Sequence, residues 1–246
     1  MRWLLDRLGF LRTLLFSLPL IYVYTLVLGV GTLLVAPFDR RQRLLGGIGR
    51  LWARLILLTC FIRVEARGRE NLEAGKHYVV VANHVSYIDI PALLVHLPAG
   101  ARFMAKKSLF YIPLFGWYMR LTGHLPVRRA GAYGNARQVL QAMRYIRQGH
   151  SLVVFPEGGR SHTGRLEPFK PGMFLAGVKA GAPILPVTIV GSGRLLPRFR
   201  WHLRPGRVKI IISPPVETQG LKREDIEGLV ARVHRTIEQN LAEAGQ

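Results

Sequence analysis

The run from Thr13 to Phe38 carries no charged residue, and it constrains the fold more than any other feature of the chain. At about 1.5 Å of rise per residue, roughly 20 helical residues cross the hydrocarbon core of a bilayer, so the run is long enough to span one. It is too long for the apolar region of a typical secretory signal, and no small-x-small cleavage site follows it. The sequence therefore predicts a membrane-attached N-terminus.

Two arrangements of this N-terminus fit the sequence. Basic residues flank the uncharged run on both sides, so the positive-inside rule gives no orientation. In the next apolar stretch, residues 43–62, Arg50 and Arg54 are four apart and share one helical face, from which they can reach lipid headgroups. We favour a re-entrant or interfacial helical pair over a single span. A buried core hairpin is the alternative that needs no membrane.

Charge and cysteine content narrow the class of protein. The chain has 246 residues, with 35 basic against 14 acidic residues and a formal net charge of +21, so it favours an anionic partner such as a membrane surface or a nucleic acid. Cys60 is the single cysteine, which excludes a disulfide within the chain and is typical of a reducing compartment.

After Arg63 short apolar runs alternate with amphipathic segments. Strands are expected at residues 77–83, 101–105, 151–155, 184–190 and 207–212. Helices are expected at 133–149, which Gly149 ends, and at about 222–242, because their apolar residues follow the helical period. Buried strands separated by helices predict an α/β domain with a largely parallel sheet and helices on both faces. We expect two domains: residues 1–62 as a membrane-anchoring helical segment, and residues 63–246 as the α/β domain.

The first buried run ends in the sequence Asn-His-Val-Ser-Tyr-Ile-Asp, residues 83–89. Loops at the carboxyl ends of parallel strands are where such sheets place ligands. Ser86 and Asp89 have the spacing of a capping box, which predicts a helix starting near Tyr87 and leaves His84 in the preceding turn. There the Asp89 carboxylate can fold back onto the imidazole, fix its tautomer and make it a general base for a hydroxyl group. A capping Asp beside an inert loop His is the alternative.

A second polar turn, Pro-Glu-Gly-Gly-Arg-Ser at residues 156–161, follows the run at 151–155. Its glycines expose backbone N–H groups, and Arg160 offers a bidentate grip, a combination that suits a phosphate group. Glu157 is expected to accept a hydrogen bond from a glycerol hydroxyl or to hold Arg160 in place.

Together these segments resemble the glycerolipid acyltransferase family. Residues 83–89 resemble its Asn-His-x-x-x-x-Asp block, and residues 155–161 are similar to its Phe-Pro-Glu-Gly-Thr-Arg-Ser block. Residues 123–129 and 182–187 resemble its other two blocks, and all four occur in the family's order over residues 75–190. The membrane-associated N-terminus also resembles that of bacterial 1-acyl-sn-glycerol-3-phosphate acyltransferases.

The resemblance implies a role for each matching residue. His84 becomes the general base and Asp89 its orienting partner. Substrate contacts are expected from eight further residues: Asn83, Ser86, Lys106, Arg129, Glu157, Gly158, Gly159 and Arg160. Among these, Arg129, Arg160 and Lys106 are the expected phosphate contacts. Gly159 replaces the family's usual Thr, and Arg128 stands where an acid is common, which leaves the acceptor open.

The implied reaction moves a fatty acyl group from acyl-CoA or acyl carrier protein to the 2-hydroxyl of lysophosphatidic acid, at the cytoplasmic face of a bacterial inner membrane. Another lysolipid, such as a lyso-ornithine lipid, is an alternative acceptor. No metal-ligand spacing is present, so neither a metal nor a cofactor is expected. The expected partners are membrane lipid, the lysophospholipid and the acyl donor. From another class, a nucleic-acid-binding membrane protein is the rival, because Arg residues interleave with Phe199 and Trp201 in residues 194–207.

Overall fold

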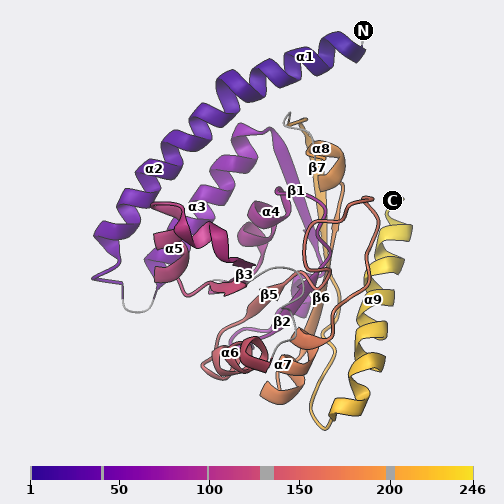
Figure 1. The fold of residues 1–246 in the computed structure, drawn as a ribbon. Coiled ribbons are helices and arrows are strands. Elements are labelled where there is room, and N and C mark those ends of the chain that lie inside the picture. The colour runs from indigo at the N-terminus through magenta and orange to yellow at the C-terminus, as the bar shows by residue number, and fades with distance from the viewer. Residues whose placement is uncertain (1, 40–41, 99, 128–135, 198–202, 246) are drawn as a thin grey trace.

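The N-terminal helices, which end at Thr59, form a pair packed on an α/β body (Figure 1). The computed structural model describes residues 2–39, 42–98, 100–127, 136–197 and 203–245. One continuous helical segment contains α1 (Arg2–Arg12), the π-helical turn η1 (Thr13–Ser17) and α2 (Leu18–Val35), and α3 (Arg43–Thr59) follows. Within the described residues, one helix, Arg7–Val35, is long and apolar enough to cross a membrane. Two successive helices, α2 and α3, are therefore present at the N-terminus as expected.

Seven strands form one sheet in the described part of the chain, in the order β1-β7-β6-β2-β5-β3-β4. Every neighbouring pair is parallel except β6 and β7, which are antiparallel. The strands are β1 (Ile62–Arg67), β2 (Val79–Ala82), β3 (Arg102–Lys106), β4 (Leu125–Val127), β5 (Leu152–Val154), β6 (Ile184–Val190) and β7 (Gly206–Ile212).

Helices cover both faces of this sheet, as predicted. Residues of α3 and α4 (Asp89–His96) share one buried apolar cluster with the strands, and α6 (Ala136–Arg147), α7 (Gly172–Ala180) and α9 (Ile226–Glu243) share the other. The remaining short elements are η2 (Arg69–Asn71), η3 (Lys107–Tyr111), α5 (Phe115–Leu121), α8 (Ser192–Leu195) and η4 (Arg223–Asp225). Figure 1 shows α9 on the far side of the sheet from α2.

The five expected strands and the two expected helices are present, but the sequence patterns missed two strands. β1 alternates buried and exposed residues, as an edge strand does, so it lacks the continuous apolar run of the central strands. β4 is three residues long and contains Pro126, which is tolerated because β4 lies at the other edge.

One expectation about α3 is half wrong. Arg54 is exposed, but Arg50 is partly buried and its guanidinium donates to the carbonyl oxygen of Leu97, 3.1 Å away. Arg50 therefore satisfies a loop carbonyl beside α4 instead of reaching headgroups together with Arg54.

Candidate active site

Strand order brings the polar turns of the sequence together at the carboxyl ends of the parallel strands. β2, β5, β3 and β4 are neighbours and parallel, so their carboxyl ends lie side by side. His84 follows β2, Glu157 follows β5, and Lys106 ends β3. Arg129 comes two residues after β4 ends, and it lies outside the described residues.

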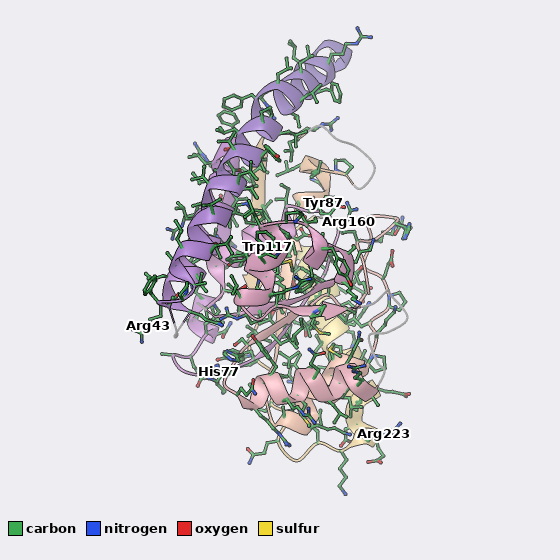
Figure 2. All side chains as sticks on the ribbon, turned by 60° about the vertical axis from the view of Figure 1, so that its left-hand side comes forward. Arg43, His77, Tyr87, Trp117, Arg160 and Arg223 are labelled. Carbon is green, nitrogen blue, oxygen red and sulfur yellow. The ribbon has the colours of Figure 1, made fainter. Side chains whose placement is uncertain are left out.

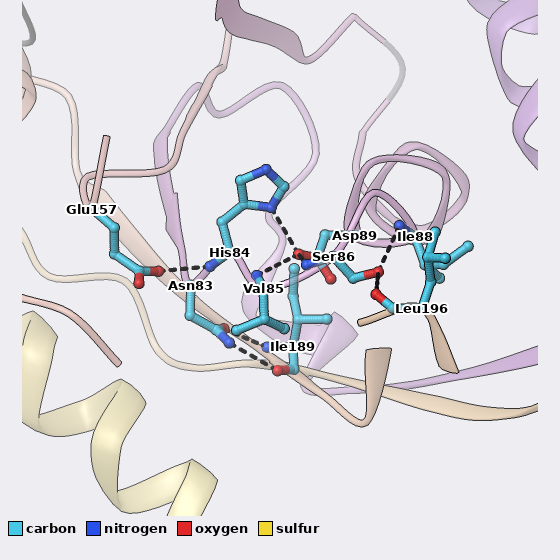
Figure 3. A network of polar contacts seen from close by, with 9 residues as sticks. All are labelled: Asn83, His84, Val85, Ser86, Ile88, Asp89, Glu157, Ile189 and Leu196. Carbon is cyan, nitrogen blue, oxygen red and sulfur yellow. Dashed lines mark hydrogen bonds and ion pairs between the residues drawn. The ribbon is translucent and has the colours of Figure 1, made fainter. Parts of the chain in front are cut away.

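His84 and Asp89 form a hydrogen-bonded pair in the turn between β2 and α4 (Figure 3). The imidazole Nδ1 lies 2.7 Å from the carboxylate Oδ2 of Asp89, whose side chain is fully buried. An ionised Asp89 keeps the proton on Nδ1, which leaves Nε2 with a free lone pair. His84 is thus oriented to accept a proton through Nε2.

Asp89 also holds the turn together. Its Oδ2 accepts hydrogen bonds from the backbone N–H groups of Val85 and Ser86, both at 2.9 Å. The backbone N–H of Asp89 donates to the carbonyl of Ser86 rather than to its side chain, so only half of the expected capping box forms. The helix α4 begins at Asp89, two residues after the expected start near Tyr87.

Two further contacts hold His84 from the neighbouring turn. The ring of Phe155 stacks on the imidazole, with ring centroids 4.0 Å apart. Glu157 accepts hydrogen bonds from the backbone N–H of His84 at 2.7 Å and of Glu167 at 3.2 Å. Burial raises the pKa of the Glu157 carboxyl to about 8, although both backbone donors lower it. Glu157 therefore ties the two polar turns together.

Asn83 and Ser86 are buried beneath the site, which corrects the expectation that they contact substrate. The Asn83 amide donates to and accepts from the backbone of Ile189 in β6, at 2.9 and 2.7 Å. The Ser86 hydroxyl donates to the carbonyl of Leu196 at 3.0 Å. Because these contacts occupy the polar atoms of both side chains, Asn83 and Ser86 shape the loop that carries His84.

A cavity of about 830 Å³ opens between the N-terminal helices and the carboxyl ends of the parallel strands. His84, Lys106 and the turn 158–160 line its polar part. The rest of its wall is mainly apolar and comes from α2, α3, α4 and α5, including Leu28, Trp52, Leu94 and Phe115. One cavity therefore joins a basic, phosphate-compatible region to an apolar region.

Arg160 packs against an aromatic ring that the sequence patterns did not single out. Its guanidinium carbon lies 3.7 Å from the centroid of the Tyr87 ring (Figure 2). Tyr87 stands in the same turn as His84, so this cation–π contact connects the two polar turns on the cavity side. Gly158, with φ of +84°, and Gly159 line the cavity beside Arg160. Both glycines therefore lie beside the space that a ligand in this cavity would fill.

Phe155, Tyr87 and the backbone role of Glu157 were missed from the sequence, because aromatic stacking and contacts between distant turns leave no periodic signal. Among the described residues, no group of three or more His, Cys, Asp or Glu side chains has a metal-binding arrangement.

The α/β domain carries a His–carboxylate pair at the point where the basic and apolar parts of the cavity meet. This arrangement is typical of a protein that acts on an amphipathic substrate. A family model described as acyltransferase matches residues 63–190. The chain belongs to the acyltransferase family.

Relatives with known names agree with this membership. A 1-acyl-sn-glycerol-3-phosphate acyltransferase of Chlamydomonas reinhardtii is 37% identical over 82% of this chain and 60% of its own length. A chloroplastic one of Brassica napus is 36% identical over 73% of this chain and 52% of its own length. The chain thus spans a little over half the length of these relatives. The crystal structure of the 1-acyl-sn-glycerophosphate acyltransferase PlsC from Thermotoga maritima has a TM-score of 0.83 and 30% identity, covering 99% of this chain and 98% of its own.

Proposed function

We propose that this chain transfers a fatty acyl group to the 2-hydroxyl of lysophosphatidic acid and so forms phosphatidic acid. The observation that carries the proposal is the His84–Asp89 pair, placed where the apolar cavity meets Arg160 and Lys106. The named relatives support the acceptor, since their names specify 1-acyl-sn-glycerol 3-phosphate. The proposed acyl donor is acyl-CoA or acyl carrier protein, acting as co-substrate, and no cofactor takes part.

In the proposed mechanism His84 acts as a general base. Its Nε2 removes the proton from the acceptor hydroxyl as the oxygen attacks the thioester carbonyl, and Asp89 stabilises the imidazolium that forms. When the intermediate collapses, the C–S bond breaks and the leaving thiolate takes the proton from Nε2. The acyl group passes directly to the acceptor, with no acyl-enzyme, and the base is restored.

Arg160 and Lys106 are the proposed phosphate contacts, together with Arg129. These cationic side chains would supply charge-assisted hydrogen bonds to the phosphate, and the Arg160 fork would add geometric selectivity. The apolar walls of the cavity suit an acyl chain, because burying methylene groups is favourable by about 0.8 kcal/mol each.

We also propose the cytoplasmic face of a bacterial inner membrane as the site of action. The long apolar helix and the net charge of +21 suit attachment to an anionic leaflet. A lone, unpaired Cys60 is compatible with the reducing side.

One assay tests the function. Purified protein is given acyl-CoA or acyl carrier protein and one of several lysolipids, including lysophosphatidic acid and a lyso-ornithine lipid, and the products are identified by mass. We expect phosphatidic acid, and its absence beside another acylated product would reassign the acceptor. Salt-sensitive binding of oligonucleotides as strong as the binding of anionic vesicles, without acyl transfer, would favour the nucleic-acid alternative.

A further inference from the structure

The segment Lys107–Leu121, called here the η3–α5 segment, has apolar side chains on two opposite faces. Its inner face lines the cavity with Leu114, Phe115 and Met119. Its outer face exposes four large side chains: Tyr111 (64% exposed), Ile112 (47%), Trp117 (43%) and Leu121 (38%). An apolar cluster of this kind on the outside of a domain is typical of a contact surface rather than of ordinary solvated surface.

The outer face of the η3–α5 segment continues the exposed apolar surface of the N-terminal helices. Leu114 packs against α2, where its Cβ would lie 2.8 Å from a Cβ added at Gly29. At the other end of α5, Gln42 donates to the carbonyl of Leu121 at 3.0 Å. α2 itself exposes many large apolar residues, among them Val27, Val30 and Leu34. A leaflet that covers α2 is therefore adjacent to the η3–α5 segment.

Two cations lie near the ring of Tyr111 on this face. The ammonium of Lys107 lies 5.6 Å and the guanidinium of Arg120 6.0 Å from the centroid of the Tyr111 ring. Tyr and Trp with neighbouring Lys and Arg are the residues that proteins place at the level of lipid headgroups. The sequence also has no acidic residue between Asp89 and Glu157, so no carboxylate of this stretch repels an anionic surface.

From these contacts we infer that the η3–α5 segment is a second membrane-contact element, distinct from the N-terminal helices and independent of the reaction proposed above. Its outer apolar side chains enter the boundary between headgroups and acyl chains of an anionic leaflet. Lys107 and Arg120 bind lipid phosphates there. Because the inner face of the same segment lines the cavity, this contact holds the cavity wall at the bilayer surface.

A local probe tests the inference on the full-length protein without using turnover. With Cys60 replaced by Ala, Ile112→Cys carries an environment-sensitive bimane group in vesicles of equal parts phosphatidylcholine and phosphatidylglycerol. The matched control is Arg223→Cys, an exposed position far from Trp117 (Figure 2). We expect the probe at 112 to shift to shorter wavelength and to be quenched by nitroxide-labelled lipid, and the probe at 223 to be quenched only by aqueous acrylamide.

A charge variant completes the test. Lys107→Gln combined with Arg120→Gln should lower lipid quenching relative to aqueous quenching by about fivefold for each charge removed. The control pair Arg232→Gln and Arg235→Gln, two exposed cations of α9, should leave that ratio unchanged. Equal aqueous quenching at 112 and 223 would overturn the inference. So would a probe at 112 shielded from both quenchers, because a second copy or another protein would then cover the segment.

Discussion

At the scale of single residues, the site depends on Asp89 having more than one role. The same carboxylate oxygen accepts from the His84 ring and from two backbone N–H groups, so the tautomer of the base and the shape of its turn have one cause. A change at Asp89 therefore alters the imidazole and the backbone of its turn together.

Changing Asp89 to Asn should weaken these roles, because Nδ1 of His84 and both backbone N–H groups contact the same oxygen. If the amide oxygen takes that position, it lacks the negative charge that stabilises the imidazolium. If the NH₂ group takes it, the backbone hydrogen bonds are lost and the proton is favoured on Nε2, the wrong tautomer. We expect kcat to fall about 10²–10⁴-fold, as for His84→Ala, with a small change in acceptor binding. Steady-state kinetics checks this, and His84→Ala with nearly full kcat would contradict the proposed base.

Arg160 and Tyr87 allow a graded prediction. Arg160→Ala removes a charge-assisted contact and should raise the acceptor KM about ten- to hundredfold, with the donor KM little changed. Tyr87→Ala removes the ring that holds the guanidinium, a contact of about 1 kcal/mol, and should raise the same KM about fivefold. Tyr87→Phe keeps the ring and serves as the control. A change confined to the donor KM would indicate that Arg160 contacts the thioester donor and not the acceptor phosphate.

The raised pKa of Glu157 predicts that the free energy of unfolding depends on pH. Its pKa rises from 4.5 to about 8 in the fold, so the native state keeps a proton that the unfolded chain releases. The resulting stabilisation is complete below about pH 4.5 and is lost as the pH rises to about 8. Denaturant unfolding in detergent should show this fall in the free energy of unfolding for the wild type, relative to Glu157→Gln. Identical pH profiles for the two proteins would contradict the prediction.

At the scale of elements, glycine decides how closely α2 approaches α5. A Cβ at Gly29 would meet the Cβ of Leu114 at 2.8 Å, whereas one at Gly31 would have nothing within 4 Å. Since the atom met at Gly29 is the base of a side chain, it cannot swing away. The two glycines stand two residues apart in one helix, so they form a matched pair.

Gly29→Ala should lower the free energy of unfolding by about 1–3 kcal/mol through overpacking. Gly31→Ala should raise it by up to about 1 kcal/mol, because Ala favours the helix. Thermal unfolding in detergent compares the two variants. A gain in stability for both variants would show that α5 shifts to make room for the added methyl group, and it would contradict the predicted overpacking.

At the scale of the whole molecule, the last part of the expected anchoring segment, residues 1–62, belongs to the core of the α/β domain. Ile56, Leu57 and Cys60 belong to the apolar cluster under β2 and β7, and β1 already begins at Ile62. We therefore propose that the separable anchor ends before α3. Asp39 belongs with the body, since its carboxylate accepts from the backbone N–H groups of Arg43 and Leu45.

Two truncations test where the anchor ends. Removing residues 1–38 keeps Asp39 and α3, so we expect a folded chain that a high-salt wash releases from membranes. Removing residues 1–62 strips core residues from the sheet and should give an unfolded, aggregated chain. Cell fractionation and circular dichroism distinguish these outcomes. If the chain without residues 1–38 resists the salt wash, α1 and α2 are not the principal anchor.

Local patterns in the sequence determined the uncharged helix, the central strands, the long helices and the His84–Asp89 pair, because periodicity and short spacing act within a few residues. Only the tertiary structure decided the contacts between turns distant in sequence: Phe155 on the imidazole, Glu157 on the backbone of His84, and Tyr87 under Arg160. Strand order also removed Asn83 and Ser86 from the substrate site by burying them against β6 and the Leu196 loop. Side chains next to each other in sequence point to different neighbours once strands pair, and that pairing is a property of the whole sheet.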